Sequence, residues 1–258
     1  MSNEHIISVD LTLCKSCGLC QKDCIHGLWN ITNTGAEITS QGCMKCGHCV
    51  AICPHGAIAM TGFDEVPEEL RYDMQPEADA LLSMIKGRRS IRHFTQQDVP
   101  NEIVKKIIEA GRYTPTGRNR QGVTYVILRN NISEYEKLAV SVLRKAQPLI
   151  GIFYKQFRHF RIDDQFIFKG APVAIVVKSD DKVDGALAAS AMELVARSYG
   201  LGVLYNGMFP IAAKLTRKLR RKLSAASSGK VVLALAIGYP SVKYQRTAQR
   251  EKPIVFYD

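Results

Sequence analysis

The sequence predicts an α+β protein made of a small cysteine-bearing module followed by a larger domain. All 8 cysteines of the 258 residues lie in two four-cysteine runs between Cys14 and Cys53. Residues 62–78 then carry acids, two prolines and little hydrophobic periodicity, as domain connections do. Beyond them, apolar runs of strand length alternate with amphipathic helical segments. We therefore expect a module at residues 1–64, a linker at 65–77 and a second domain at 78–258.

The two cysteine runs lie in similar stretches of chain. Residues 6–9 precede the first run as residues 37–39 precede the second. After the runs, the Gly-Leu-Trp of residues 27–29 corresponds to the Gly-Ala-Ile of residues 56–58. We expect each half of the module to form a strand, a cysteine loop, a short helix and a second strand.

The spacing in each run, Cys-x-x-Cys-x-x-Cys-x-x-x-Cys, is the one by which bacterial ferredoxins bind two cubane iron–sulfur clusters. In these modules three sulfurs of a run share one cluster and the fourth cysteine ligates the other. The chain resembles them over about residues 5–62, except that Ile25 replaces a proline that supplies no ligand. Zinc favours separated cysteine pairs and disulfides suit secreted chains, so both alternatives fit less well. The predicted [4Fe-4S] ligands are Cys14, Cys17, Cys20 and Cys53 for one cluster, and Cys43, Cys46, Cys49 and Cys24 for the other.

Charge is distributed unevenly along the chain. Residues 1–75 carry 4 Lys and Arg against 9 Asp and Glu, whereas the remaining residues carry 31 against 15. A basic second domain suits phosphate-bearing cofactors, acidic protein partners or nucleic acid. No apolar run reaches the ~18–20 residues that span a bilayer, and the first residues lack a signal-peptide pattern. We expect a cytoplasmic protein with no membrane partner.

The second domain shows helical and strand patterns in alternation. Three arginines and a serine fall within five residues at 88–92, which suits a phosphate cradle but also a solvated basic turn. We expect helices at 78–87, 99–110, 133–146 and 184–199, and strands at 123–128, 169–177 and 231–237.

Three motifs in this domain occur in a characteristic order. They are Arg-Arg-Ser-x-Arg-x-Phe at 88–94, Pro-Thr-Gly-x-Asn-x-Gln at 115–121 and Gly-Tyr-Pro at 238–240. Over roughly residues 78–258 the chain thereby resembles the nitroreductase family of FMN-dependent oxidoreductases, and as a whole it resembles ferredoxin–nitroreductase fusions. The resemblance implies a mixed sheet flanked by helices, and a homodimer with FMN at the subunit interface.

The resemblance also implies which residues contact FMN. The family pattern assigns the phosphate, the ribityl chain and the pyrimidine edge to Arg88, Arg89, Ser90 and Arg92, with Arg250 as a late phosphate-binding residue. It assigns a contact from the other subunit to Pro115, Thr116 and Asn119, with Thr116 where the family has serine. It assigns a backbone contact with the flavin to Tyr205, Asn206 and Gly207.

The implied activity is that of an oxidoreductase that passes electrons from two [4Fe-4S] clusters to FMN and then, as a pair, to a small-molecule acceptor. A nitroaromatic compound, a quinone, an activated alkene or another flavin could be the acceptor, and a redox protein could be the electron donor. The alternative is an electron-transfer adaptor between redox proteins. No side chain is predicted to be catalytic.

Two further segments allow more than one interpretation. The aromatic-rich segment 133–168 could form a lid over the flavin, a packed excursion or a dimer contact. Residues 212–223 predict a single basic helix with Leu215, Leu219 and Leu223 facing inward. Its basic face is best explained as solvated, and we do not expect a nucleic-acid partner because no aromatic residues are interleaved with the charges.

Overall fold

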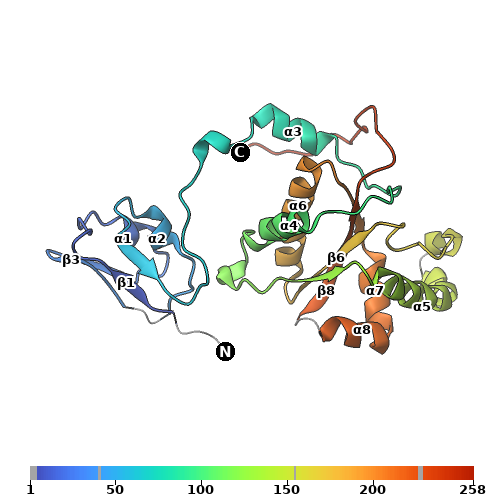
Figure 1. Ribbon diagram of the computed structural model, residues 1–258, viewed down its shortest axis with the longest axis horizontal. Coiled ribbons are helices and arrows are strands. Elements are labelled where there is room, and N and C mark those ends of the chain that lie inside the picture. Colours follow the sequence, from blue (N-terminus) through green and yellow to red (C-terminus); the bar gives the residue numbers. More distant parts are fainter. Residues whose placement is uncertain (1–4, 40–41, 154, 226–228) are drawn as a thin grey trace. The chain divides into compact units, whose positions relative to one another are not determined.

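The structure, a computed structural model, describes residues 5–39, 42–153, 155–225 and 229–258. The chain divides into two compact units, and Figure 1 labels most of their helices and several of their strands. The first comprises Met1–Gln75 with Arg118–Arg120, and the second comprises Pro76–Gly117 with Gln121–Asp258. The boundaries 1–64, 65–77 and 78–258 stay a prediction. Among the described residues, no helix is long and apolar enough to cross a membrane.

The first unit repeats one arrangement of elements. Strands β1 and β4 pair antiparallel, as do β2 and β3. Its elements are β1 (Ile7–Val9), α1 (Leu19–Asp23), β2 (Trp29–Thr32), β3 (Gly35–Ile38), α2 (His48–Ile52) and β4 (Ile58–Met60), followed by the short helix η1 (Tyr72–Met74). Each half therefore runs strand, loop, helix and strand, as the sequence predicts.

The repeat extends to the backbone of the cysteine loops. Ser16 and Lys45 occupy equivalent positions with φ of 52° and 57°, and Gly18 and Gly47 with φ of 73° and 72°. A left-handed conformation is costly for residues with a side chain and persists where the surrounding structure imposes it. The same constrained turn therefore presents the cysteines in both halves.

A four-stranded sheet with the order β5-β6-β8-β7 forms the centre of the second unit. All pairs of named strands are antiparallel. A parallel bridge joins Ser90 to Val203 at the edge of this sheet. The strands are β5 (Thr124–Leu128), β6 (Val173–Ser179), β7 (Gly202–Asn206) and β8 (Lys230–Gly238).

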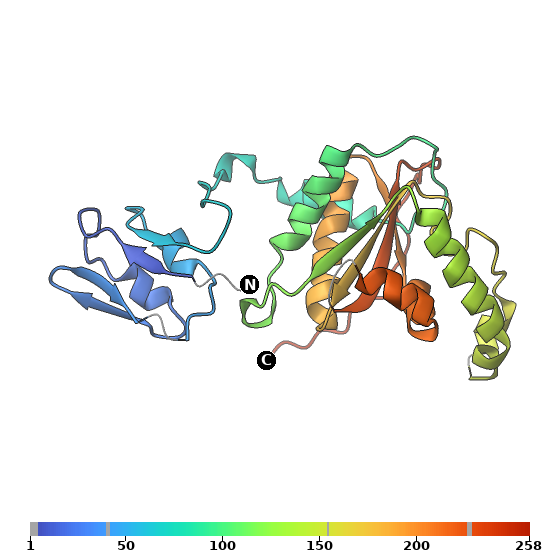
Figure 2. The ribbon, with the colours of Figure 1, turned by 60° about the horizontal axis from the view of Figure 1, so that its bottom comes forward.

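Helices cover both faces of this sheet, as Figure 2 shows. One face packs against α4 and α6, and the other against α5, α7 and α8. The helical segments from residue 78 onward are α3 (Ala78–Lys86), α4 (Asn101–Arg112), η2 (Gly117–Asn119), α5 (Ile132–Phe153), η3 (Lys155–His159), α6 (Lys182–Ser198), α7 (Met208–Leu215) and α8 (Arg217–Ser224).

The alternation of side chains along the central strands explains this arrangement. In β6, Ala174 and Val176 pack into the cluster beneath α5, α7 and α8, whereas Ile175 and Val177 pack into the cluster beneath α4 and α6. Every residue of β6 is buried. Successive side chains of a strand point to opposite faces, so a continuous apolar run suits a strand covered on both sides.

The prediction of one basic helix at 212–223 is wrong. Thr216 has extended dihedral angles (φ −128°, ψ 125°) and separates α7 from α8. Leu219 and Leu223 are buried as expected, but Leu215 is 50% exposed because it lies before the break. The helix expected at 133–146 continues as α5 to Phe153, with Pro148 inside it.

Candidate functional site

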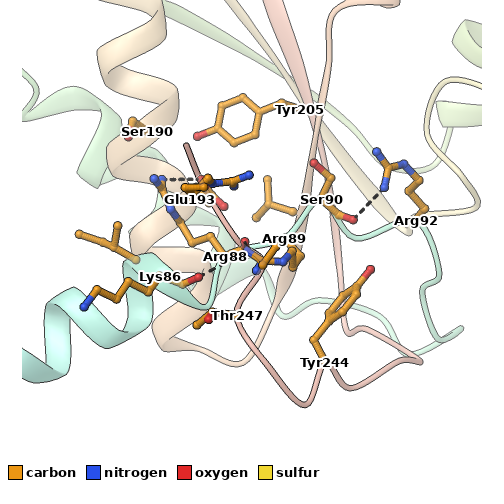
Figure 3. Close-up of a pocket in the computed structure, with 14 residues that line it drawn as sticks. Lys86, Arg88, Arg89, Ser90, Arg92, Ser190, Glu193, Tyr205, Tyr244 and Thr247 are labelled. Atoms are coloured by element: carbon orange, nitrogen blue, oxygen red, sulfur yellow. Dashed lines mark hydrogen bonds and ion pairs between the residues drawn. The ribbon is translucent and has the colours of Figure 1, made fainter. Parts of the chain in front are cut away.

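A cavity of about 1020 Å³ opens in the second unit beside the end of α3 (Figure 3). Segments far apart in the sequence meet there: the turn after α3, the middle of α6, strand β7 and the extended C-terminal stretch. The lining residues are Ile85, Lys86, Arg88, Arg89, Ser90, Arg92, Ser190, Glu193, Val203, Tyr205, Tyr244, Thr247, Ala248 and Arg250. Five of them are basic and one, Glu193, is acidic. We call these six charged residues and Ser90 the cradle.

The arginine turn is held against β7 by backbone contacts. The Ile91 N–H donates to the Val203 carbonyl at 3.0 Å, next to the bridge between Ser90 and Val203. Gly202 makes this approach possible, because a Cβ there would lie 2.6 Å from Ile91 Cγ1. Secondary structure thus fixes the direction in which the arginines leave the backbone.

The arginines of the cradle differ in how they are engaged. Arg88 Nη1 lies 3.0 Å from Glu193 Oε2. Arg89 Nη1 donates to the carbonyls of Lys86 and Arg88, but its Nη2 is buried with no hydrogen-bond partner. Arg92 donates to the Ser90 carbonyl at 3.4 Å, a long contact. Unused, fixed donors among several cations fit an anion such as a phosphate monoester.

Tyr205 forms part of the cavity wall. Its hydroxyl donates to the Ala189 carbonyl at 3.0 Å. Burial, and next the negative charge of Glu193, raise the pKa of this phenol well above its usual value. Tyr205 is therefore a neutral hydrogen-bonding group at physiological pH.

Two neighbours of Tyr205 do not line the cavity. The buried Asn206 side chain accepts from the Met208 and Phe209 N–H groups at 2.9 and 2.8 Å, so it caps α7. Its Nδ2 donates to the Ile167 carbonyl at 2.7 Å. The Asn206 side chain is therefore committed to the fold, and only the backbone of Asn206 and Gly207 is available for the predicted flavin contact.

The residues predicted to reach a flavin from the other subunit also lie outside the cavity. The Thr116 hydroxyl accepts from the Gln121 N–H at 2.9 Å, and the next N–H, that of Gly117, donates to Asp184 at 3.1 Å. Asn119 belongs to the first compact unit, where its Nδ2 donates to the Met44 and Lys45 carbonyls at 3.2 and 2.8 Å. The role of Pro115, Thr116 and Asn119 stays a prediction.

The sequence reasoning missed several members of the site, above all Glu193. This acid lies four residues after Ala189 and three before Ala196, both fully buried, so helical periodicity places it on the covered face of α6. A carboxylate on a buried helix face needs a cationic or hydrogen-bonding partner, so this position could have marked Glu193 as a site residue. Lys86, Tyr244 and Thr247 carry no comparable sequence signal, because tertiary folding alone brings them to the cavity.

The cysteines form a second site, in the first unit. The residues that line one small cavity there include Cys14, Cys17, Cys20 and Cys53, the four cysteines predicted for one cluster. A cysteine of the second run thus lines the same cavity as three cysteines of the first.

In the second run, Cys49 is buried and Cys43 and Cys46 are partly buried. The pKa of Cys49 is raised to about 11, first by burial, with smaller contributions from Cys46 and Cys43. These three thiols are therefore close enough to interact. The fourth predicted ligand, Cys24, is partly buried against the core of the first unit, which also includes Cys14, Cys20, Cys43, Cys49 and Cys53.

Comparison with known proteins agrees with both sites. Residues 13–58 match the 4Fe-4S dicluster domain, and residues 85–239 match the nitroreductase family. The fold and the two sites define an oxidoreductase with an iron–sulfur module joined to a flavoprotein-type domain. The chain belongs to the nitroreductase family, since the match covers more than half of its length. The predicted fusion and the predicted α+β fold are confirmed.

Relatives of the chain differ in the substrates that their names state. An iodotyrosine deiodinase of Hydra vulgaris is 24% identical over 197 residues, which are 68% of this chain and 70% of that protein. A chloronitrobenzene nitroreductase of Comamonas testosteroni is 24% identical over 204 residues, 64% of this chain and 88% of that protein. A crystal structure of a nitroreductase with bound FMN from Bacteroides fragilis superposes with a TM-score of 0.59 at 21% identity, and the match covers 69% of this chain and 98% of that one.

Proposed function

We propose that the cradle binds FMN and that the protein passes electrons from its two [4Fe-4S] clusters through this flavin to a small organic acceptor. The observation that carries the proposal is a large cavity lined by five cations, one of which, Arg89, has a buried Nη2 with no hydrogen-bond partner. A dianionic phosphate would satisfy that donor and offset part of the positive charge. Bound FMN supplies a carrier that takes up electrons singly and releases them in pairs, whereas clusters transfer one at a time.

Within this function the residues of the chain bind and orient. Arg89, Arg92 and Arg250 present charge toward the phosphate and the electron-rich part of the ring, and Ser90 offers a hydroxyl. Tyr205 shapes the wall as a neutral group. None of them has to act as a nucleophile, so specificity depends on what fits beside the ring.

The cofactors can be tested in protein purified without oxygen. We expect about eight irons and one FMN per chain, together with a visible spectrum that bleaches when the clusters are photoreduced. Zinc in place of iron, or a flavin band that persists after cluster reduction, would contradict the proposal.

Stopped-flow mixing of the reduced protein separates an enzyme from an adaptor. We expect rapid reoxidation by a nitroaromatic compound, a quinone, an activated alkene or free flavin. Reoxidation by a redox protein alone would instead support the electron-transfer adaptor.

We also propose a homodimer with FMN at the subunit interface, as the family resemblance implies. In the segment at 115–121, which the resemblance assigns to this interface, Arg118, Asn119 and Gln121 all adopt positive φ between 49° and 54°. Such conformations concentrate at ligand-binding segments. Analytical ultracentrifugation should give twice the monomer mass, and a monomer that retains FMN at micromolar concentration would refute the dimer.

A further inference from the structure

We propose that Glu193 is a positioning residue, which fixes the Arg88 guanidinium in the cradle and lowers the positive charge that the cradle presents to the reduced flavin. The inference rests on the proposed function, because it concerns the same flavin site. Figure 3 shows the pair, with the dashed line between Arg88 and Glu193.

The ion pair joins two segments that are distant in the sequence. Arg88 Nη1 and Glu193 Oε2 are 3.0 Å apart, and the two side chains are 34% and 8% exposed. A nearly buried carboxylate is costly unless it is paired, so Glu193 requires a cation at this place. Arg88 therefore cannot move freely, unlike an arginine on a solvated turn.

Helix α6 holds the Arg88 turn at a second point. Arg197, one turn after Glu193, donates from Nη2 to the Gly87 carbonyl at 3.3 Å. The backbone before Arg88 and the tip of its side chain are thus both fixed by α6. By contrast, Arg89 Nη2 has no partner and Arg92 makes one long contact, so these two remain available for an anion.

The charges give Glu193 a second effect. It is the single carboxylate among the described residues that line the cavity, where five cations face it. A negative charge in a partly desolvated site disfavours the arrival of electrons nearby, and a positive charge favours it. Glu193 therefore makes the flavin harder to reduce than a cradle of cations alone would.

Three variants separate the effect of charge from the effect of reach. Glu193→Gln keeps the size and an acceptor for Arg88 but removes the charge. Glu193→Asp keeps the charge but is one methylene too short to reach Arg88. Glu102→Gln is the control, because Glu102 is an exposed acid of α4 in the same unit, paired with Lys105.

The measurements are the flavin midpoint potential, the dissociation constant of FMN from the apoprotein and the melting temperature. Glu193→Gln should favour the reduced over the oxidised flavin about tenfold, a rise of about 30 mV for a two-electron couple. Its FMN affinity should stay within about threefold of wild type, because the amide still accepts from Arg88. Glu193→Asp should keep the wild-type potential but bind FMN about tenfold more weakly. Glu102→Gln should change neither quantity.

A double-mutant cycle in which each charge is neutralised provides a second test, and it covers the case in which a buried variant folds poorly. Arg88→Gln changes the more exposed partner and should lower the potential, and the double variant Arg88→Gln/Glu193→Gln should return it toward wild type because the net charge is restored.

Either of two results would overturn the proposal: a wild-type potential in Glu193→Gln, or wild-type FMN affinity in Glu193→Asp. A change in melting temperature alone would show that the pair is only structural. A wild-type protein that binds no FMN would instead refute the proposed function, and that result is distinct because it appears before any variant is made.

Discussion

The close approach of Ile91 to Gly202 gives the most direct test of how the fold builds the site. In Gly202→Ala the new Cβ would lie 2.6 Å from Ile91 Cγ1, 2.8 Å from its Cβ and 2.9 Å from its Cγ2. Ile91 is 4% exposed and its N–H is bonded to Val203, so it cannot retreat without cost. Overpacking of this kind costs about 1–3 kcal/mol.

That energy can appear in two measurable ways. If the cost lowers the stability of the second unit as a whole, the melting temperature should fall by about 2–12 °C for a domain of this size. If the arginine turn moves away from β7 instead, FMN should bind about 5- to 150-fold more weakly, at about 1.4 kcal/mol per tenfold. Calorimetry and fluorescence titration of the apoprotein with FMN measure both.

Two further variants control this experiment. Gly122→Ala should stay within about 0.5 kcal/mol of wild type, because nothing lies within 4 Å of a Cβ there. Ile91→Ala removes both γ-carbons, so the loss in Gly202→Ala/Ile91→Ala should be smaller than the sum of the single losses by about 0.5–3 kcal/mol. Strictly additive losses, or a Gly202→Ala protein with wild-type stability and affinity, would refute the packing argument.

Three other predictions concern the clusters, a buried phenol and a helix cap. Cys53→Ser should lower the iron content by about half, and adding Cys14→Ser should remove no more, whereas adding Cys43→Ser should remove the rest. Tyr125→Phe should raise the unfolding free energy by about 1 kcal/mol, because the Tyr125 hydroxyl is buried without a partner. Burial raises the pKa of Tyr125 to about 12 from 10.0, so wild-type stability should decline as the pH rises from 10 toward 12, and this decline should weaken in the variant. Asn206→Ala should cost about 0.5–2 kcal/mol of stability through loss of the α7 cap, with a smaller loss of FMN affinity than Arg89→Ala.

Each of these predictions has an outcome that contradicts it. Iron analysis in which Cys14→Ser and Cys53→Ser act additively would show that the two sulfurs serve different clusters. A Tyr125→Phe protein that melts below wild type, or keeps the same alkaline decline, would mean that the hydroxyl has a partner. An Asn206→Ala protein with wild-type melting and lost flavin would show that its side chain contacts the cofactor.

The sequence predicts those features that depend on local chemistry. The spacing of the cysteines follows from the geometry of a cubane, so the group of Cys14, Cys17, Cys20 and Cys53 could be assigned before the structure placed these residues around one cavity. The arginines at 88–92 are neighbours in the sequence and line one cavity in the structure, and their role as an anion site stays a proposal.

Features that depend on tertiary packing were harder to predict. The leucine spacing at 215, 219 and 223 fits one helix, but extended Thr216 lets two short helices cover the sheet, and it leaves Leu215 exposed. Glu193 was overlooked because a lone acid in an alanine-rich helix reveals its partner only when α6 packs beside the arginine turn.

The exchange of a cysteine between the two halves of the small module has a consequence for its assembly. Because Cys53 lines one cavity with Cys14, Cys17 and Cys20, a fragment cut between the halves would lack one of the four cysteines predicted for that cluster. Since the predicted cluster needs cysteines from both halves, we expect metal incorporation and folding of the module to proceed together in an all-or-none manner.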